Sequence, residues 1–105
     1  MPRPIAVRMT EFKAARPEDR AQLARLIAEG QSIIRRHAGC IRCEVLLDDA
    51  DPTLVMGLEL WRDHQDRAEA GAAIPGALVQ SALAIMSADP VSRSLAIPPE
   101  FNARD

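Results

Sequence analysis

Residues 38–61 read AGCIRCEVLLDDADPTLVMGLELW, and this stretch decides the fold. Two apolar runs, over residues 40–48 and 53–61, flank an acidic segment that contains Pro52. Acidic side chains that bond their own backbone, followed by a proline that fixes φ, are typical of a turn. The stretch therefore predicts a β-hairpin, whose two strands are antiparallel.

The segments on either side of the hairpin complete the pattern. Apolar and polar residues alternate over 5–12 and again over 91–97, and each segment predicts a strand. After Pro17 in the sequence, apolar residues recur at spacings of three and four, which predicts a helix. Helical signals also follow the hairpin, at 63–71, where Asp63 can cap the helix, and after Pro75. The order β-α-β-β-α-β predicts an α+β, ferredoxin-like fold, with a four-stranded antiparallel sheet and helices on one face.

Both faces of this sheet are expected to be apolar. The strand at 53–61 carries Leu54, Met56, Leu58 and Leu60 on one side, and Val55, Gly57 and Trp61, interrupted by Glu59, on the other. Helices can cover only one face, so the second apolar face needs another cover. We expect a second copy of the chain to supply it, which would give a symmetric homodimer.

Length and composition limit the classes of protein to consider. A chain of 105 residues fits one domain over 1–105, with its core at about 5–97 and a polar tail at 98–105. A net charge of −2 argues against a nucleic-acid partner. No apolar run reaches the roughly 18 residues of a membrane span, and the N-terminus lacks the apolar region of a signal peptide. The two cysteines are read as thiols, and we expect a cytoplasmic protein.

The hairpin stretch resembles the central signature of the antibiotic biosynthesis monooxygenase family, whose domains are dimeric α/β barrels. The shared features are a Gly-Cys pair that opens the second strand, a Glu-Val-Leu run, an Asp and a Pro in the turn, and a Glu-x-Trp that ends the third strand. Here they are Gly39, Cys40, Glu44, Val45, Leu46, Asp48, Asp51, Pro52, Glu59 and Trp61. The order of elements matches from about Ile5 to Ile97.

Two residues are candidates for a catalytic general base. His64 is expected at the start of a helix, where the helix dipole favours the neutral imidazole that can accept a proton; the alternative is a solvated surface histidine. Glu59 lies on a mostly apolar strand face, where partial loss of hydration favours proton transfer to its carboxylate. The alternative for Glu59 is an ion pair with Arg42 or Arg8 across the sheet.

Trp61, Arg93 and Met9 are the candidate substrate-binding residues. Trp61 shares a strand face with Glu59 and would form a flat wall for an aromatic substrate, unless it is a core residue. Arg93 interrupts the apolar side of the last strand, so it would either bind an anionic oxygen of a substrate or extend its charge to solvent. Met9 lies in the first strand, where a methionine also fits as core filler.

A metal or cofactor is not expected. His37, Cys40 and Cys43 spell HxxCxxC, a pattern that invites a metal or redox interpretation. In a regular strand, however, residues three apart face opposite sides, so the two thiols would not chelate one ion together. No second pair of Cys or His residues completes a tetrahedral site.

The family resemblance implies a cofactor-independent monooxygenase that oxidises a small aromatic or polycyclic phenolic substrate with O2. An apolar pocket between sheet and helices would hold a flat substrate, His64 or Glu59 would remove a proton, and the substrate anion would reduce O2. The alternative is a non-catalytic dimeric barrel that binds a small hydrophobic ligand or a protein partner. Ala70 and Gly76 stand where the family often has histidine and favour the alternative, whereas Glu59-x-Trp61 favours the enzyme.

Overall fold

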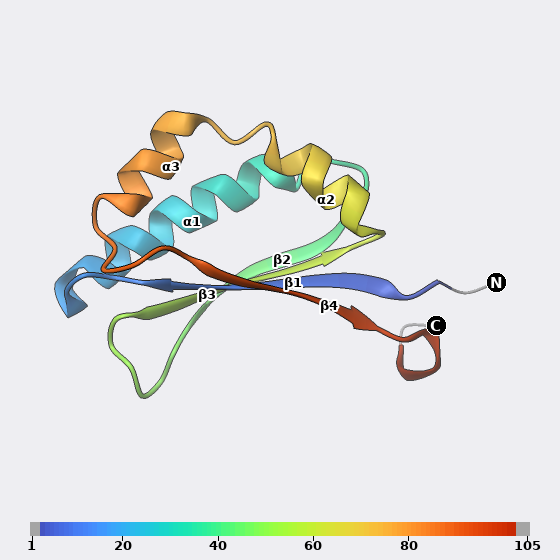
Figure 1. Ribbon diagram of the computed structural model, residues 1–105, viewed down its shortest axis with the longest axis horizontal. Coiled ribbons are helices and arrows are strands. Elements are labelled where there is room, and N and C mark those ends of the chain that lie inside the picture. Colours follow the sequence, from blue (N-terminus) through green and yellow to red (C-terminus); the bar gives the residue numbers. More distant parts are fainter. Residues whose placement is uncertain (1–2, 103–105) are drawn as a thin grey trace.

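The computed structural model describes residues 3–102 and confirms the predicted order of elements (Figure 1). The elements are β1 (Ile5–Lys13), the 3-10 turn η1 (Pro17–Asp19), α1 (Arg20–Ile34), β2 (Cys40–Leu47), β3 (Leu54–Trp61), α2 (His64–Gly71), α3 (Gly76–Leu83), β4 (Val91–Ile97) and the 3-10 turn η2 (Pro99–Phe101). The predicted polar tail thus contains one short turn, and its last residues, 103–105, lie outside the described residues. None of the helices described is both long and apolar enough to span a bilayer.

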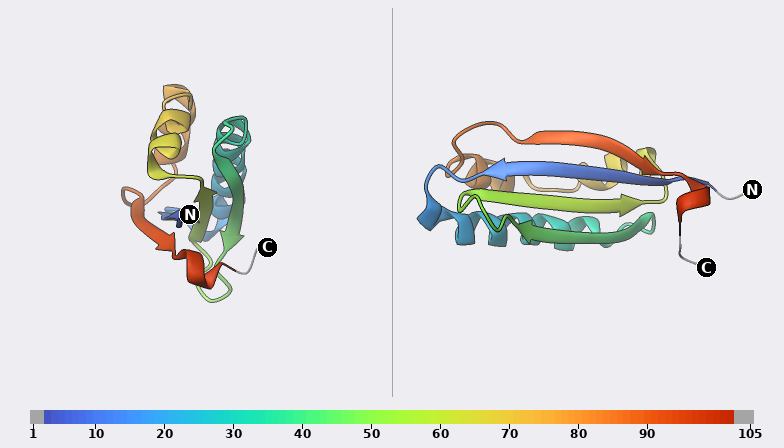
Figure 2. Two further views of the ribbon diagram at one scale, coloured as in Figure 1. Left: turned by 90° about the vertical axis from the view of Figure 1, so that its right-hand side faces the viewer. Right: turned by 90° about the horizontal axis from the view of Figure 1, so that it is seen from below.

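The four strands form one antiparallel sheet in the order β2-β3-β1-β4. All three helices lie on the same face of this sheet (Figure 1). Seen from the other side, no helix within residues 3–102 covers the strands (Figure 2, right). This arrangement confirms the predicted α+β ferredoxin-like fold.

The helix that follows β3 begins as the sequence predicts. The Asp63 carboxylate accepts a hydrogen bond from the backbone N–H of Asp66 at 2.8 Å. This N-cap satisfies one of the free N–H groups of the first turn. The cap therefore sets α2 directly after the end of β3.

The helix-facing side of the sheet holds two separate core clusters. Trp61, at the end of β3, packs in one cluster with Ala6, Ile34, Cys43 and Ala70. Val55, at the start of β3, packs in the other with Ala14 and Leu23. Trp61, Leu23 and Val55 are fully buried. Between these two clusters, the residues on the helix-facing side of the sheet belong to neither cluster.

The uncovered face of the sheet is largely apolar. Leu54, Met56, Leu58 and Leu60 of β3 alternate with the buried residues of the helix-facing side and are all half-buried. On β4, Val91 and Leu95 are 56% and 43% exposed. A monomer therefore presents a row of aliphatic side chains on this face.

The strand β2 contains an irregularity that the sequence did not predict. The register shifts between Cys40 and Arg42, so that Cys40 pairs with Trp61 and Cys43 pairs with Glu59. Trp61 and Glu59 lie on the same side of β3, and the bulge therefore places both cysteines on the helix-facing side. The expectation that Cys40 and Cys43 face opposite sides was wrong, because the bulge inserts one extra residue between them.

Candidate functional site

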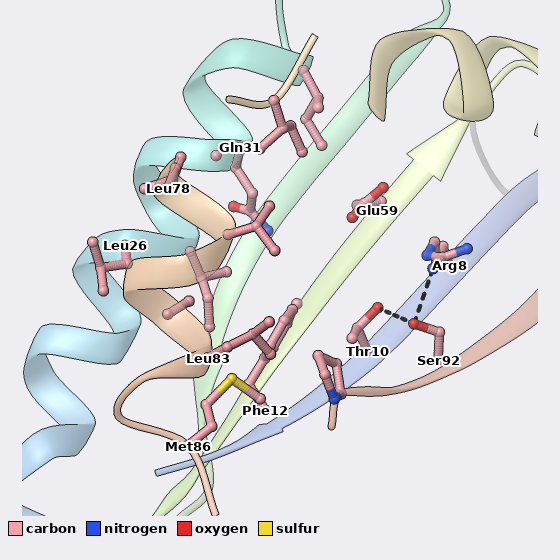
Figure 3. A pocket seen from close by; sticks show the side chains of 18 of the residues that line it. Arg8, Thr10, Phe12, Leu26, Gln31, Glu59, Leu78, Leu83, Met86 and Ser92 are labelled. Carbon is pink, nitrogen blue, oxygen red and sulfur yellow. Dashed lines mark hydrogen bonds between the residues drawn. The ribbon is translucent and has the colours of Figure 1, made fainter. Parts of the chain in front are cut away.

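A cavity of about 250 Å³ lies between the helices and the sheet, next to the gap between the two core clusters. Its floor belongs to β1, β3 and β4, and its roof to α1, α3 and the segment after α3. Figure 3 shows the division: the polar side chains of Arg8, Thr10, Glu59 and Ser92 lie on the strands, opposite the apolar Leu26, Leu78, Leu83 and Met86. An apolar chamber with a few convergent polar groups is the usual form of a small-molecule site.

Two glycines help to keep this space open. Gly30 of α1 and Gly57 of β3 both line the cavity. A Cβ atom on Gly57 would lie 3.2 Å from the ring of Phe12, which is tighter than an ordinary contact. A Cβ atom on Gly30 would lie 3.8 Å from Leu78, an ordinary contact distance. Larger side chains at either position would therefore take up cavity volume.

The carboxylate of Glu59 is held in the floor of the cavity by two donors. The indole Nε1 of Trp61 donates to Glu59 Oε1 at 2.9 Å, and Arg67 Nε approaches the same oxygen at 3.4 Å. Glu59 is 8% exposed and Trp61 is fully buried behind it. Both bonds end on Oε1, so Oε2 is the oxygen that a ligand in the cavity can use. Trp61 thus fixes the carboxylate and does not itself line the cavity.

Arg8 lies directly across from Glu59 in the pairing of β1 with β3. Its Nη2 donates to Ser92 Oγ at 3.1 Å, and Ser92 Oγ is 2.9 Å from Thr10 Oγ1 (Figure 3). Its Nε is buried and has no hydrogen-bond partner among residues 3–102. Burial, and then the positive charge of Arg67, lower the pKa of the Arg8 guanidinium, while Glu59 acts in the opposite direction. Arg8, Thr10, Glu59, Arg67 and Ser92 together form the polar side of the cavity, called the polar wall below. This wall therefore carries a guanidinium with an unused donor.

His64 does not reach this cavity. It is the first residue of α2, its side chain is exposed, and it is not among the residues that line the cavity. Of the two candidate bases, Glu59 is the one inside the apolar chamber.

Met9 and Arg93 lie on the other side of the sheet from Glu59 and Trp61. They are paired neighbours on β1 and β4. Both line a groove of about 220 Å³ on the uncovered face, together with Glu11, Met56, Val91 and Leu95. The five candidate residues therefore do not form one site. Because side chains alternate along a strand, the odd-numbered residues of β1, including Met9, lie on the opposite face of the sheet from Glu59.

Sequence reasoning missed most of the polar wall. Arg8 entered it only as a candidate partner of Glu59, and Thr10, Arg67 and Ser92 were not singled out. The alternation along β1 contained a usable signal, because Arg8 and Thr10 share a strand face with Ala6. The contribution of Ser92 depends on the pairing of β1 with β4, which joins segments more than 80 residues apart.

His37, Asp66 and Glu69 place one imidazole and two carboxylates within 4.8 Å of one another, as metal ligands often lie. The Nδ1 of His37 accepts a hydrogen bond from the Gly39 N–H at 3.0 Å. The proton of the neutral ring is therefore on Nε2, which faces Glu69 Oε1 at 3.2 Å. A metal would need the Nε2 lone pair, so this geometry suits a hydrogen bond between His37 and Glu69.

Cys43 is buried in the Trp61 cluster, and the half-buried Cys40 packs against the same cluster. The Cys43 thiol lies 3.8 Å from the Gln31 carbonyl oxygen, to which it donates a hydrogen bond. Burial is the main cause that raises the pKa of Cys43 to about 11, and it also raises the pKa of Cys40. The raised pKa values lower the thiolate fraction of both cysteines, and therefore their reactivity as nucleophiles.

Comparison with known proteins gives one family. Residues 5–72 match the profile of the family described as antibiotic biosynthesis monooxygenase. That region contains the bulge, Trp61 and three residues of the polar wall, Arg8, Glu59 and Arg67. No curated protein matches the sequence at a significant level.

Several solved structures have the same fold. A proposed antibiotic biosynthesis monooxygenase from Caulobacter crescentus superposes with a TM-score of 0.77 at 15% identity, over 88% of each chain. SnoaB, a cofactor-independent oxygenase from Streptomyces nogalater, gives a TM-score of 0.70 at 16% identity, over 96% of this chain and 98% of that one. Rv0793 from Mycobacterium tuberculosis gives a TM-score of 0.71 at 20% identity, over 89% of this chain and 93% of that one. At these identities the likeness concerns the fold.

Proposed function

Because the chain belongs to the antibiotic biosynthesis monooxygenase family, we propose that it is a cofactor-independent monooxygenase that oxidises a small aromatic, phenolic substrate with O2. One observation carries the proposal: a carboxylate, Glu59, lies in the floor of an apolar cavity large enough for aromatic rings. The similarity in fold to SnoaB, a cofactor-independent oxygenase, is consistent with this activity.

Glu59 is the proposed general base. Trp61 holds Oε1, so Oε2 can accept a proton from a phenolic hydroxyl or from an acidic ring carbon of the substrate. His64, the other candidate, is exposed and outside the cavity. The side chains of the roof exclude water and hold the ring, so that the anion forms where Arg8 and Arg67 stabilise its charge.

The chemistry after proton removal belongs to the substrate and O2. The electron-rich anion transfers electrons to O2, and the reduced oxygen combines with the substrate carbon. For an anthrone, a ring CH2 group and O2 become a ring carbonyl and water, so that the carbon loses four electrons and O2 gains four. The protein residues supply burial, orientation and a site for the proton.

A homodimer through the uncovered face of the sheet is part of this proposal. The aliphatic row on β3 and the exposed Val91 and Leu95 of β4 support it, because apolar surface of this kind favours burial against another surface. Light scattering at micromolar concentration is expected to give twice the 11.5 kDa chain mass. A stable particle of 11.5 kDa would contradict the dimer.

Oxygen uptake tests the enzymatic proposal. The wild-type protein is supplied with anthrone or a small quinol in an oxygen electrode, against the same protein after heat denaturation. Glu59→Gln keeps the shape of the side chain and removes the base, so uptake should fall by about 100-fold to 10,000-fold. Glu29→Gln makes the same chemical change on the exposed side of α1 and serves as the matched control.

The outcomes separate the interpretations. Uptake that is lost in Glu59→Gln and retained in Glu29→Gln supports Glu59 as the base. Oxygen uptake that is lost in His64→Gln and retained in Glu59→Gln would identify His64 as the base. Binding of these compounds without any uptake above the denatured control would favour the non-catalytic ligand-binding alternative.

A further inference from the structure

Arg8 holds a hydrogen-bond donor that the folded chain leaves unused. Its Nε is buried, and no acceptor among residues 3–102 bonds to it. The same guanidinium uses Nη2 for Ser92. An unsatisfied buried donor is unfavourable, and native proteins seldom keep one without a reason. Since Arg8 lines the cavity, an acceptor on a ligand is the partner that this donor lacks.

The charges that line the cavity do not balance. Among the described residues that line it, the charged ones are Arg8, Arg67 and Glu59. Glu59 already faces Arg67 at 3.4 Å, with only part of either side chain exposed. The repulsion between Arg8 and Arg67 is one cause of the lowered pKa of Arg8, after burial. One positive charge therefore remains uncompensated, and a ligand with one negative charge would neutralise it.

Two hydroxyl groups extend the same wall. Ser92 Oγ receives the Arg8 Nη2–H and lies 2.9 Å from Thr10 Oγ1. Figure 3 shows both hydroxyls beside the Arg8 guanidinium. Hydroxyl groups rotate to donate or accept, so they can complete the hydrogen bonds of a second ligand oxygen.

The rest of the cavity fits the body of such a ligand. Leu26, Leu78, Leu83 and Met86 face the polar wall across an apolar space. Its volume of about 250 Å³ exceeds the roughly 150 Å³ of an engineered apolar cavity that binds benzene. We propose that the cavity binds a planar aromatic monoanion of about two fused rings, whose anionic oxygen, a carboxylate or a phenolate, bonds Arg8 Nε.

This inference rests on the proposed function for the location of the substrate, but it concerns binding and not turnover. Calorimetric titration without a reaction therefore tests it separately from oxygen uptake. The probes are 2-naphthoate and its neutral isostere 2-naphthamide. A bond between charged groups in a buried site predicts that naphthoate binds about 10-fold to 100-fold more tightly than the amide. A third probe, 2-naphthol at neutral pH, reports by its absorbance whether the bound phenol becomes a phenolate.

Arg8→Gln removes the charge of the proposed anchor and should abolish the preference for naphthoate over naphthamide. Arg36→Gln makes the same change on an exposed arginine after α1 and should leave the preference intact. The absorbance of bound naphtholate in the wild type, lost in Arg8→Gln, would identify the phenolate as the ligand class. Equal binding of naphthoate and naphthamide without naphtholate formation, or a preference that survives in Arg8→Gln, would overturn the proposal. So would the absence of binding by all three probes at millimolar concentration in a wild-type protein that is folded by circular dichroism.

Discussion

Replacing Arg8 with methionine should make the protein more stable while it removes a residue of the site. Methionine retains a long apolar side chain but has neither the unused donor nor the second positive charge beside Arg67. The substitution leaves Glu59 and Arg67 as a balanced pair. A gain in stability is expected because the folded chain disfavours the charge on Arg8, as its lowered pKa indicates.

The size of the effect follows from the hydrogen bonds. Leaving the Arg8 Nε donor buried and unsatisfied costs about 1–3 kcal/mol in the wild type. The substitution also loses the bond from Arg8 Nη2 to Ser92, which contributes about 0.5–1.5 kcal/mol. The net expectation is a gain of about 1 kcal/mol in the free energy of unfolding. In a domain of this length, that raises Tm by about 4–8 °C.

Urea unfolding followed by tryptophan fluorescence measures this change. Trp61 is the single tryptophan of the chain and is fully buried, so its emission reports the loss of the core. Arg67→Met is the paired variant, because it removes the guanidinium that contacts Glu59 and should lower stability. A loss of more than about 1 kcal/mol in Arg8→Met would refute the reasoning, since the guanidinium would then be satisfied in the folded chain.

Three further predictions concern other parts of the chain. Gly30→Ala should stabilise the protein by about 0.5–1 kcal/mol in urea unfolding, because its Cβ meets Leu78 at an ordinary 3.8 Å; a loss of stability would contradict the packing described for α1. Cys43 should react with iodoacetamide at pH 8 about 100-fold more slowly in the folded than in the unfolded protein, because its pKa rises from 9.0 to about 11; equal rates by mass spectrometry would contradict this. The Arg62 hydrogen bond lowers the pKa of Asp66, so Asp66 stabilises the fold above its ordinary pKa of 3.8 and loses that contribution as the pH falls. Asp66→Asn should therefore have a lower free energy of unfolding than the wild type at pH 6, and this difference should become smaller toward pH 2. A difference in the free energy of unfolding that does not depend on pH would argue against the ion pair.

Local sequence signals were sufficient for most of the fold. The hairpin follows from the acidic turn and Pro52 between two apolar runs, and the start of α2 follows from Asp63, whose carboxylate does cap it. The alternation along β3 correctly separated Glu59 and Trp61 from the leucines of the other face. These features depend on residues close in the sequence, where spacing fixes geometry.

The bulge and the polar wall depend on contacts that spacing does not fix. The register shift between Cys40 and Arg42 changes the side of Cys40 relative to the rest of β2, and no residue in that segment marks it. The wall joins Arg8 of β1, Glu59 of β3 and Ser92 of β4, so it exists only once three strands have paired. Arg93 and Met9 are of suitable residue types, but strand alternation places them on the other face.

The proposed function requires that an aromatic ligand occupies the cavity between the helices and the sheet. A crystal structure of the protein with 2-naphthoate tests it most directly. We expect the rings against Leu26 and Leu78, and a carboxylate oxygen within hydrogen-bond distance of Arg8 Nε. Naphthoate bound instead in the groove of Met9 and Arg93, on the uncovered face of the sheet, would contradict the claim.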